Sequence, residues 1–372
     1  MGLLDRYRRF SELTDSEVKE GFRARAEDRR ARELERVETL DLTETTGEEM
    51  PAGEVVAAIS FAAKRALNLA PDPLSTELRD QLADLSDAPR RQVGVGNGAT
   101  ALIGAIAAAT LKPGDELVTP WPSYPLYPIA AAAAGADAIP VEHSTDPAEL
   151  AESVNGRPMS RILMVCNPND PDGNLLSADY LAALREELND QTLLVVDEAL
   201  VDYAGRDHMD ATARLVSQTS GIVLIRSLSK AWGLSSLRVG WLITGEDGEP
   251  LITRLAPLLG VPAPSEAGAL AALENTGKHV DRRVTAVRRE RARVEQQLAG
   301  SAVEFSTSSA NFIWARLPGV KSLTLSERMR AAGVKVTDGS AVGADEHIRA
   351  TISGSEAATD RLIEALRDAS SA

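Results

Sequence analysis

The chain has 372 residues, so two domains are a more natural expectation than one small domain. Its 44% hydrophobic content is ordinary for a globular protein, and its formal charge of −15 disfavours nucleic acid or an anionic membrane as a partner. A single cysteine, Cys166, excludes an internal disulfide framework. Together with the lack of an apolar stretch of about 18 residues or of a secretion signal, it predicts a cytoplasmic protein.

Residues 1–45 are predicted to form an N-terminal helical arm. The first 40 residues contain ten arginines and lysines and ten acidic residues, so the negative excess lies in the rest of the chain. Opposite charges a few positions apart favour exposed helices. We interpret the arm as a solvated surface segment rather than a dedicated partner-binding device.

Residues 46–258 are predicted to form a large α/β domain. Short apolar runs with the length of strands alternate there with longer segments of helical periodicity, such as 99–110 and 178–188. This rhythm predicts a mostly parallel central sheet flanked by helices. The predicted strands are 92–95, 116–119, 138–141, 162–166, 193–197, 222–226 and 239–244.

A smaller α+β domain is predicted for residues 259–372. A Pro/Gly-rich stretch at 256–264 favours a hinge at its start. After it, the pattern predicts helices near 281–298 and 357–367, with strands at 312–316, 334–336 and 348–352.

The most informative motif is the run from Ser227 to Arg238, with Lys230 near its centre. A lysine that forms a Schiff base with an aldehyde cofactor needs its charge held in check. A phosphate on such a cofactor needs hydroxyl donors and a guanidinium nearby, which Ser227, Ser229 and Arg238 offer. The alternative interpretation of this run alone is a polar turn after a strand.

Two further motifs follow predicted strands, beyond whose carboxyl ends the ligands of α/β sheets bind. The run from Val95 to Thr100, with two glycines, opens a helix, and backbone N–H groups at a helix start bind anions. Many strand–helix turns contain glycine, so this motif is weak by itself. The aromatic-rich run 119–128 contains Tyr124, which is suited either to stack on a heteroaromatic ring or to pack within the loop.

Two acidic residues and one arginine are the remaining candidates. Asp170 lies in an Asn-Pro-Asn-Asp-Pro-Asp-Gly loop, and Asp197 ends a hydrophobic strand. A buried carboxylate is costly unless it meets a cation, and a protonated pyridine nitrogen is such a cation. Arg349 suits bidentate binding of a carboxylate, although a surface arginine is the simpler interpretation of this residue alone.

In this order and spacing, the motifs resemble those of fold-type I pyridoxal-phosphate-dependent aminotransferases of class I and II, particularly the histidinol-phosphate aminotransferase-like branch. The resemblance extends from about residue 40 to the end of the chain. It implies pyridoxal 5′-phosphate as cofactor and amino transfer between an amino acid, or an amino-acid-like amine, and a 2-oxo acid. Such enzymes are usually homodimers with their sites at the subunit interface.

The resemblance also implies a role for each candidate residue. Lys230 would bind the cofactor covalently and then move the proton, Asp197 would partner the pyridine nitrogen, and Tyr124 would stack on the ring. Arg349 would bind the substrate's α-carboxylate, and Asn311 would lie near the substrate. The residues implied to hold the phosphate are Ser227, Ser229, Arg238 and the backbone of Ala99 and Thr100.

Three positions depart from the family pattern. Asp170 replaces an Asn, and Leu200 a Tyr, that usually donate hydrogen bonds to the cofactor's phenolic oxygen. Ala70 replaces a Tyr that usually reaches the phosphate of the neighbouring subunit. Because fold does not fix the reaction, a pyridoxal-phosphate-dependent lyase, decarboxylase or cyclase stays open as an alternative. A non-enzymatic descendant of such an enzyme is disfavoured by the intact Lys230, and four scattered histidines predict no metal site.

Overall fold

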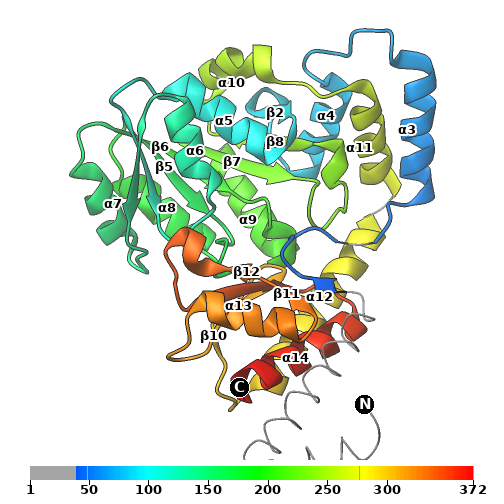
Figure 1. The fold of residues 1–372 in the computed structure, drawn as a ribbon. Helices are drawn as coiled ribbons and strands as arrows, with labels where there is room; N and C mark the ends of the chain where they lie inside the picture. The colour runs from blue at the N-terminus through cyan, green and yellow to red at the C-terminus, as the bar shows by residue number, and fades with distance from the viewer. Residues whose placement is uncertain (1–38, 48, 276, 372) are drawn as a thin grey trace, which may run out of the picture.

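The computed structural model describes residues 39–47, 49–275 and 277–371, and a seven-stranded sheet forms its larger part (Figure 1). The strands lie in the order β2-β8-β7-β6-β5-β3-β4, and only β8 runs antiparallel to its neighbours. This confirms the predicted mostly parallel sheet, and each predicted strand is present to within two residues. The strands are β2 (Val93–Gly96), β3 (Glu116–Pro120), β4 (Asp137–Val141), β5 (Ser160–Cys166), β6 (Leu193–Asp197), β7 (Ile222–Ser227) and β8 (Gly240–Thr244).

Each face of the sheet has its own apolar core. In β6, Leu194 and Val196 point into one core and Val195 into the other, because successive side chains of a strand alternate. Since both faces are covered, the strands read as continuous apolar runs. One face carries α5 (Gly98–Thr110), α6 (Leu126–Ala133) and α10 (Glu249–Leu255). The opposite face carries α4 (Thr76–Leu85), α7 (Pro147–Asn155), α8 (Ala178–Glu187) and α9 (Arg206–Ser217).

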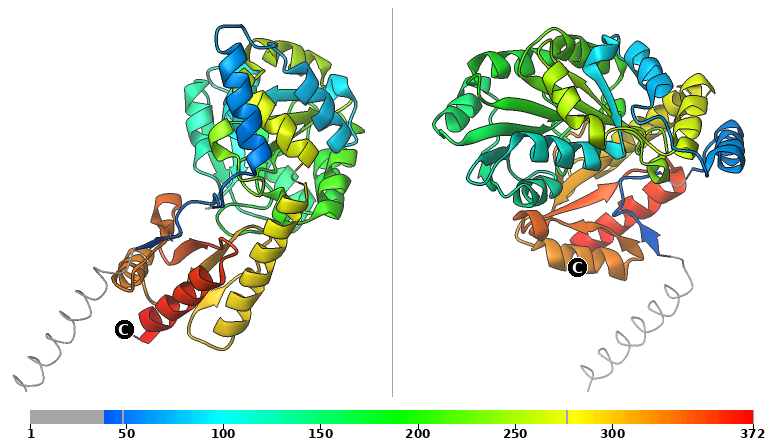
Figure 2. Two further views of the ribbon diagram at one scale, coloured as in Figure 1. Left: turned by 90° about the vertical axis from the view of Figure 1, so that its right-hand side faces the viewer. Right: turned by 90° about the horizontal axis from the view of Figure 1, so that it is seen from above.

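A smaller α+β region lies beside the large sheet, as predicted. Its antiparallel sheet has the order β12-β13-β10-β9 and is accompanied by two helices. The long helix α12 (Gly277–Leu298) begins next to the larger part of the molecule and extends along this smaller region (Figure 2). The other elements are β9 (Glu304–Phe305), β10 (Phe312–Arg316), β12 (Thr337–Asp338), β13 (His347–Thr351), α13 (Ser322–Ala331) and α14 (Glu356–Ser371).

Two segments lie in a different region from their neighbours along the chain. Helix α11 (Ala263–Asn275) lies beside α3 (Gly53–Ala66), next to the large sheet. Near the N-terminus, β1 (Leu40–Asp41) pairs in parallel with β11 (Val334–Lys335) of the smaller region. The domain division at 258/259 stays a prediction, and residues 1–38 of the predicted helical arm lie outside the described residues.

The carboxyl ends of the parallel strands bring the sequence motifs together. β2, β3, β5, β6 and β7 all end at the same edge of the sheet, and the antiparallel β8 begins there. The motifs predicted from sequence directly follow these strand ends, so the topology places them around one site. Among the described residues, no helix is long and apolar enough to cross a membrane.

Candidate active site

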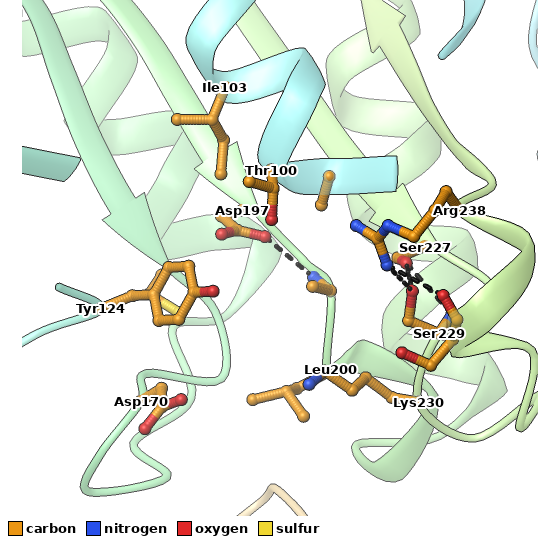
Figure 3. A pocket seen from close by; sticks show the side chains of 14 residues that line it. Thr100, Ile103, Tyr124, Asp170, Asp197, Leu200, Ser227, Ser229, Lys230 and Arg238 are labelled. Carbon is orange, nitrogen blue, oxygen red and sulfur yellow. Dashed lines mark hydrogen bonds between the residues drawn. The ribbon is translucent and has the colours of Figure 1, made fainter. Parts of the chain in front are cut away.

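A pocket opens at this edge of the sheet (Figure 3). Figure 3 shows Tyr124 and Asp170 on one side, Ser227 and Arg238 on the other, and Asp197 between them. All predicted site residues except Arg349 and Asn311 line the pocket. The lining residues that sequence reasoning did not name as site residues are Ile103, Cys166, Ala199, Leu200 and Ser235.

One end of the pocket is formed by the start of α5. Gly98 has a φ of +82°, and a Cβ there would lie 2.4 Å from Nη2 of Arg238, so only glycine fits this turn. The first N–H groups of α5 have no intrahelical acceptor, and the Asn97 side chain accepts no hydrogen bond from them; its amide nitrogen donates to Gly260 O at 3.1 Å. The helix start is therefore open to an anion directly beside the Arg238 guanidinium.

Two serine hydroxyls complete this end of the pocket. Ser227 Oγ lies 2.8 Å from Ser229 Oγ and accepts the backbone N–H of Ser229 at 3.1 Å. Arg238 donates from Nη1 to Ser229 Oγ at 3.3 Å and to Ser235 O at 3.0 Å. Hydroxyls, a guanidinium and a helix N-terminus converge here, which is the donor set that a phosphate requires.

Asp197 ends β6 at the floor of the pocket and is 3% exposed. Burial raises the pKa of its carboxyl to about 6, although hydrogen bonds from Ala199 N at 3.1 Å and Tyr127 Oη at 3.0 Å stabilise the charged form. A nearby cation therefore stabilises this buried carboxylate more than it would stabilise a solvent-exposed carboxylate.

The Tyr124 ring lies half-buried on the wall of the pocket. Its ring centroid is 5.8 Å from that of Tyr127, with an edge-on angle of 76° between the planes. Burial, followed by the charge of Asp197, raises the pKa of the Tyr124 phenol. Tyr127 is fully buried. Its ring packs edge-on against the Tyr124 ring, and its hydroxyl donates to the Asp197 carboxylate.

Lys230 follows β7, and its ammonium donates to Thr45 Oγ1. Burial lowers the pKa of Lys230, against the opposing effect of the Asp170 carboxylate. A lysine that loses its proton more easily is better suited to covalent and proton-transfer chemistry. The contact with Thr45 joins the extended N-terminal segment to the pocket.

Arg349 and Asn311 lie next to the same N-terminal segment. Arg349 forms an ion pair of 2.5 Å from Nη1 to Asp170 Oδ1, and its Nη2 donates to Thr43 O at 2.8 Å. The amide of Asn311 donates to Thr45 O at 3.0 Å. The structure thus brings both residues close to the pocket, with their side chains bonded within the protein.

The departures from the family pattern have different surroundings. Leu200 is buried at the pocket wall, where it offers no hydrogen-bond donor, and Asp170 is turned to Arg349. Ala70 is exposed in the loop after α3, outside this pocket. Cys166 is buried, and burial raises the pKa of its thiol well above the usual range.

Sequence reasoning missed two residues that contact the predicted ones. Tyr127 stands three positions after Tyr124 at the start of an apolar helix, and this spacing of one helical turn was a usable signal. Thr45 contacts Lys230 across 185 positions of the chain, and no local pattern marks it. In the described ranges 39–47, 49–275 and 277–371, no group of three or more His, Cys, Asp or Glu is placed to hold a metal ion.

A family model described as aminotransferase class I and II matches residues 41–366. The chain belongs to this family. Its relatives include histidinol-phosphate aminotransferase 1 of Mesorhizobium japonicum, 32% identical over 84% of this chain and 85% of the relative. An aromatic amino acid aminotransferase of Corynebacterium jeikeium is 32% identical over 86% of this chain and 85% of that protein.

Solved structures support the fold. The histidinol-phosphate aminotransferase of Sinorhizobium meliloti, 23% identical, has a TM-score of 0.80 and covers 92% of this chain and 94% of that one. Family membership confirms the predictions of a fold-type I aminotransferase and of pyridoxal 5′-phosphate as its cofactor. The roles of individual residues stay predictions.

Proposed function

We propose that this aminotransferase moves an amino group from a small primary amine, either an amino acid or an amino-acid-like amine, to a 2-oxo acid. The donor carbon is oxidised from amine to ketone and the acceptor carbon is reduced from ketone to amine, so no outside oxidant is needed. The observation that carries the proposal is one pocket that holds an anion-binding end, a buried Asp197 and the Lys230 amine.

The pocket residues fit the family cofactor. Gly98 leaves room for a phosphate beside Arg238, Ser227 and Ser229. Asp197 is suited to hold a protonated pyridine nitrogen, and Tyr124 is suited to cover a face of the ring. When bound, pyridoxal 5′-phosphate supplies an aldehyde that accepts the amino group and a ring that withdraws electrons from the donor carbon.

Lys230 is the proposed acid and base. Its partly buried side chain lines the same pocket as Asp197, between Ser229 on one side and Asp170 on the other (Figure 3). We propose that its Nζ removes the proton from the donor carbon and returns it one position away. The lowered pKa of Lys230 supports this role, because a base must be free of its own proton.

A second candidate function is a lyase, decarboxylase or cyclase reaction with the same cofactor. Leu200 and Asp170 favour it, because neither offers the donor that the family usually places near the cofactor's phenolic oxygen. Incubating the holoenzyme with a panel of amines and identifying the cofactor by mass spectrometry distinguishes the two. A transaminase leaves pyridoxamine phosphate, whereas a decarboxylase or lyase returns the aldehyde form and releases carbon dioxide or ammonia.

We also propose that the protein is a homodimer. Large apolar side chains are exposed along α3 and the loop after it, including Phe61 at 61%, Leu67 at 74% and Leu69 at 62%. A second copy is the proposed cover, since Ala70 in this loop stands where the family usually reaches into the neighbouring subunit. Light scattering of the native chain and of Phe61→Glu tests it, and a native monomer would refute it. A cytoplasmic location is proposed on the lone, buried Cys166.

A further inference from the structure

The guanidinium of Arg349 is already engaged within the protein. Its Nη1 binds Asp170, and its Nη2 donates to Thr43 O at 2.8 Å and to Thr337 Oγ1 at 3.4 Å. Its plane lies over the Phe312 ring, with 5.5 Å from Cζ to the centroid. Only Nε, which is buried, has no hydrogen-bond partner among the described residues. Both N–H groups of Nη2 are thus in use, so neither Nη1 with Nη2 nor Nε with Nη2 forms a free pair of donors for an incoming carboxylate.

The backbone turn that carries Asp170 is fixed by its own hydrogen bonds and by packing. Asp170 lies in a tight turn in which Gly173 N donates to Asn169 O at 2.7 Å. Gly173 has a φ of +74°, and a Cβ there would lie 2.1 Å from Ser308 Oγ, so the turn is packed directly on the smaller region. Ser309 N donates to Gly173 O at 2.8 Å, which ties the two regions together beside Asp170.

The pair changes what the pocket attracts. Asp170 is 7% exposed and supplies the negative charge that Arg349 requires, so the charge of this corner is already balanced. A carboxylate entering here would share one guanidinium with a second buried carboxylate, and two like charges at one site are strongly unfavourable. A neutral hydroxyl would instead donate a hydrogen bond to Asp170 without disturbing the ion pair.

We propose that Asp170 selects against amino donors with a carboxylate on the amine-bearing carbon and favours donors with a neutral hydrogen-bonding group there, such as amino alcohols. This inference rests on the proposed function. The amino alcohol R–CH(NH₂)–CH₂OH and the 2-oxo acid R′–CO–COOH give the hydroxyketone R–CO–CH₂OH and the amino acid R′–CH(NH₂)–COOH. The carboxylate of the 2-oxo acid must displace Asp170 from Arg349, so 2-oxo acids bind weakly.

The test compares matched donors in the native holoenzyme and in Asp170→Asn. Each pair shares one side chain, for example phenylalanine with phenylalaninol and histidine with histidinol, and the rate of cofactor conversion is measured under single-turnover conditions. We expect the native enzyme to prefer the alcohol by about tenfold or more, and Asp170→Asn to shift the ratio toward the acid by about as much, since removing one charge from a buried pair frees the other. Asp179→Asn removes the same charge from an exposed position and should leave the ratio unchanged.

An equilibrium measurement supplies a readout that needs no turnover. Calorimetry with the unreactive acid 3-phenylpropanoate and the cofactor-loaded protein should show about tenfold tighter binding to Asp170→Asn than to the native chain. A native preference for amino acids that Asp170→Asn leaves unchanged would overturn the inference while amino transfer stands. If no donor of either series yields pyridoxamine phosphate in any variant, the proposed function itself fails.

Discussion

The two sides of the pocket are built in different ways. The proposed phosphate side comes from contiguous motifs at neighbouring strand ends, where Ser227, Ser229 and Arg238 already bond to one another. The proposed substrate side comes from three distant segments, in which Thr43, Asp170 and Arg349 meet only through the tertiary fold. The residues proposed to hold the phosphate within this chain follow the family pattern, whereas Asp170, next to Arg349, departs from it. Cofactor binding can thus be kept while the choice of substrate changes.

The largest expected effect is on the cofactor side. Lys230→Ala removes the amine that we propose to carry the proton, so amino transfer should fall by at least about a thousandfold. Single-turnover conversion of the cofactor with the best donor of the panel measures it. Lys112→Ala, which removes an exposed lysine outside the pocket, should retain native rates. Substantial activity in Lys230→Ala would assign the proton transfer to another group.

Asp197→Asn tests the cofactor side through the pH dependence of protein stability. Burial raises the carboxyl pKa from 3.8 to about 6, so the cofactor-free protein loses stability as pH rises through this window and carries the full penalty above it. The asparagine amide cannot ionise, so the variant without cofactor should be more stable than native by up to about 3 kcal/mol at pH 8. The gain should shrink as pH falls through 6 toward 4. Urea unfolding across this range measures the difference.

Asp202 provides a matched control for that experiment. Burial also raises its pKa to about 6, but its carboxylate accepts from Trp232 Nε1 at 3.2 Å and does not line the pocket. Asp202→Asn should show a similar dependence of stability on pH and unchanged cofactor affinity. Asp197→Asn should bind the cofactor more weakly, because the pyridine nitrogen loses its charged partner. Equal cofactor affinity in both variants would contradict the assignment of Asp197.

Tyr127→Phe tests whether a residue that does not line the pocket affects cofactor affinity through Asp197. The change removes the 3.0 Å hydrogen bond to Asp197 and keeps the ring that packs on Tyr124. Cofactor affinity should fall by about tenfold, the effect of one hydrogen bond to a charged group. Tyr180→Phe removes a phenol bond to Ser144 O, between two residues that do not line the pocket, and should leave the affinity native. Equal affinities in the two variants would make Tyr127 a packing residue only.

The difference between the two sides also explains what the sequence could predict. Strand ends carry short motifs, so the parallel sheet, Lys230, Asp197 and Arg238 could be located from local patterns and an expected carboxyl edge. The Asp170–Arg349 pair spans 179 positions, and no periodicity encodes such a contact. The binding of a carboxylate by Arg349 stays a prediction, and the sequence held no signal for its ion pair with Asp170. Which residue pairs with a buried charge is decided by tertiary packing, and local sequence patterns carry no information on it.

The smallest expected effect concerns the outer rim of the cofactor side, at Ala70. Ala70→Tyr restores the phenol that the family usually extends to the neighbouring subunit's phosphate, and should tighten cofactor binding by at most about 1.5–3 kcal/mol. Ala70→Phe is the control, since it adds the ring without the hydroxyl. Equal cofactor retention in the two variants would show that this loop does not reach the phosphate. A gain in Ala70→Tyr that disappears when Phe61→Glu is added would require a second copy to complete the cofactor side.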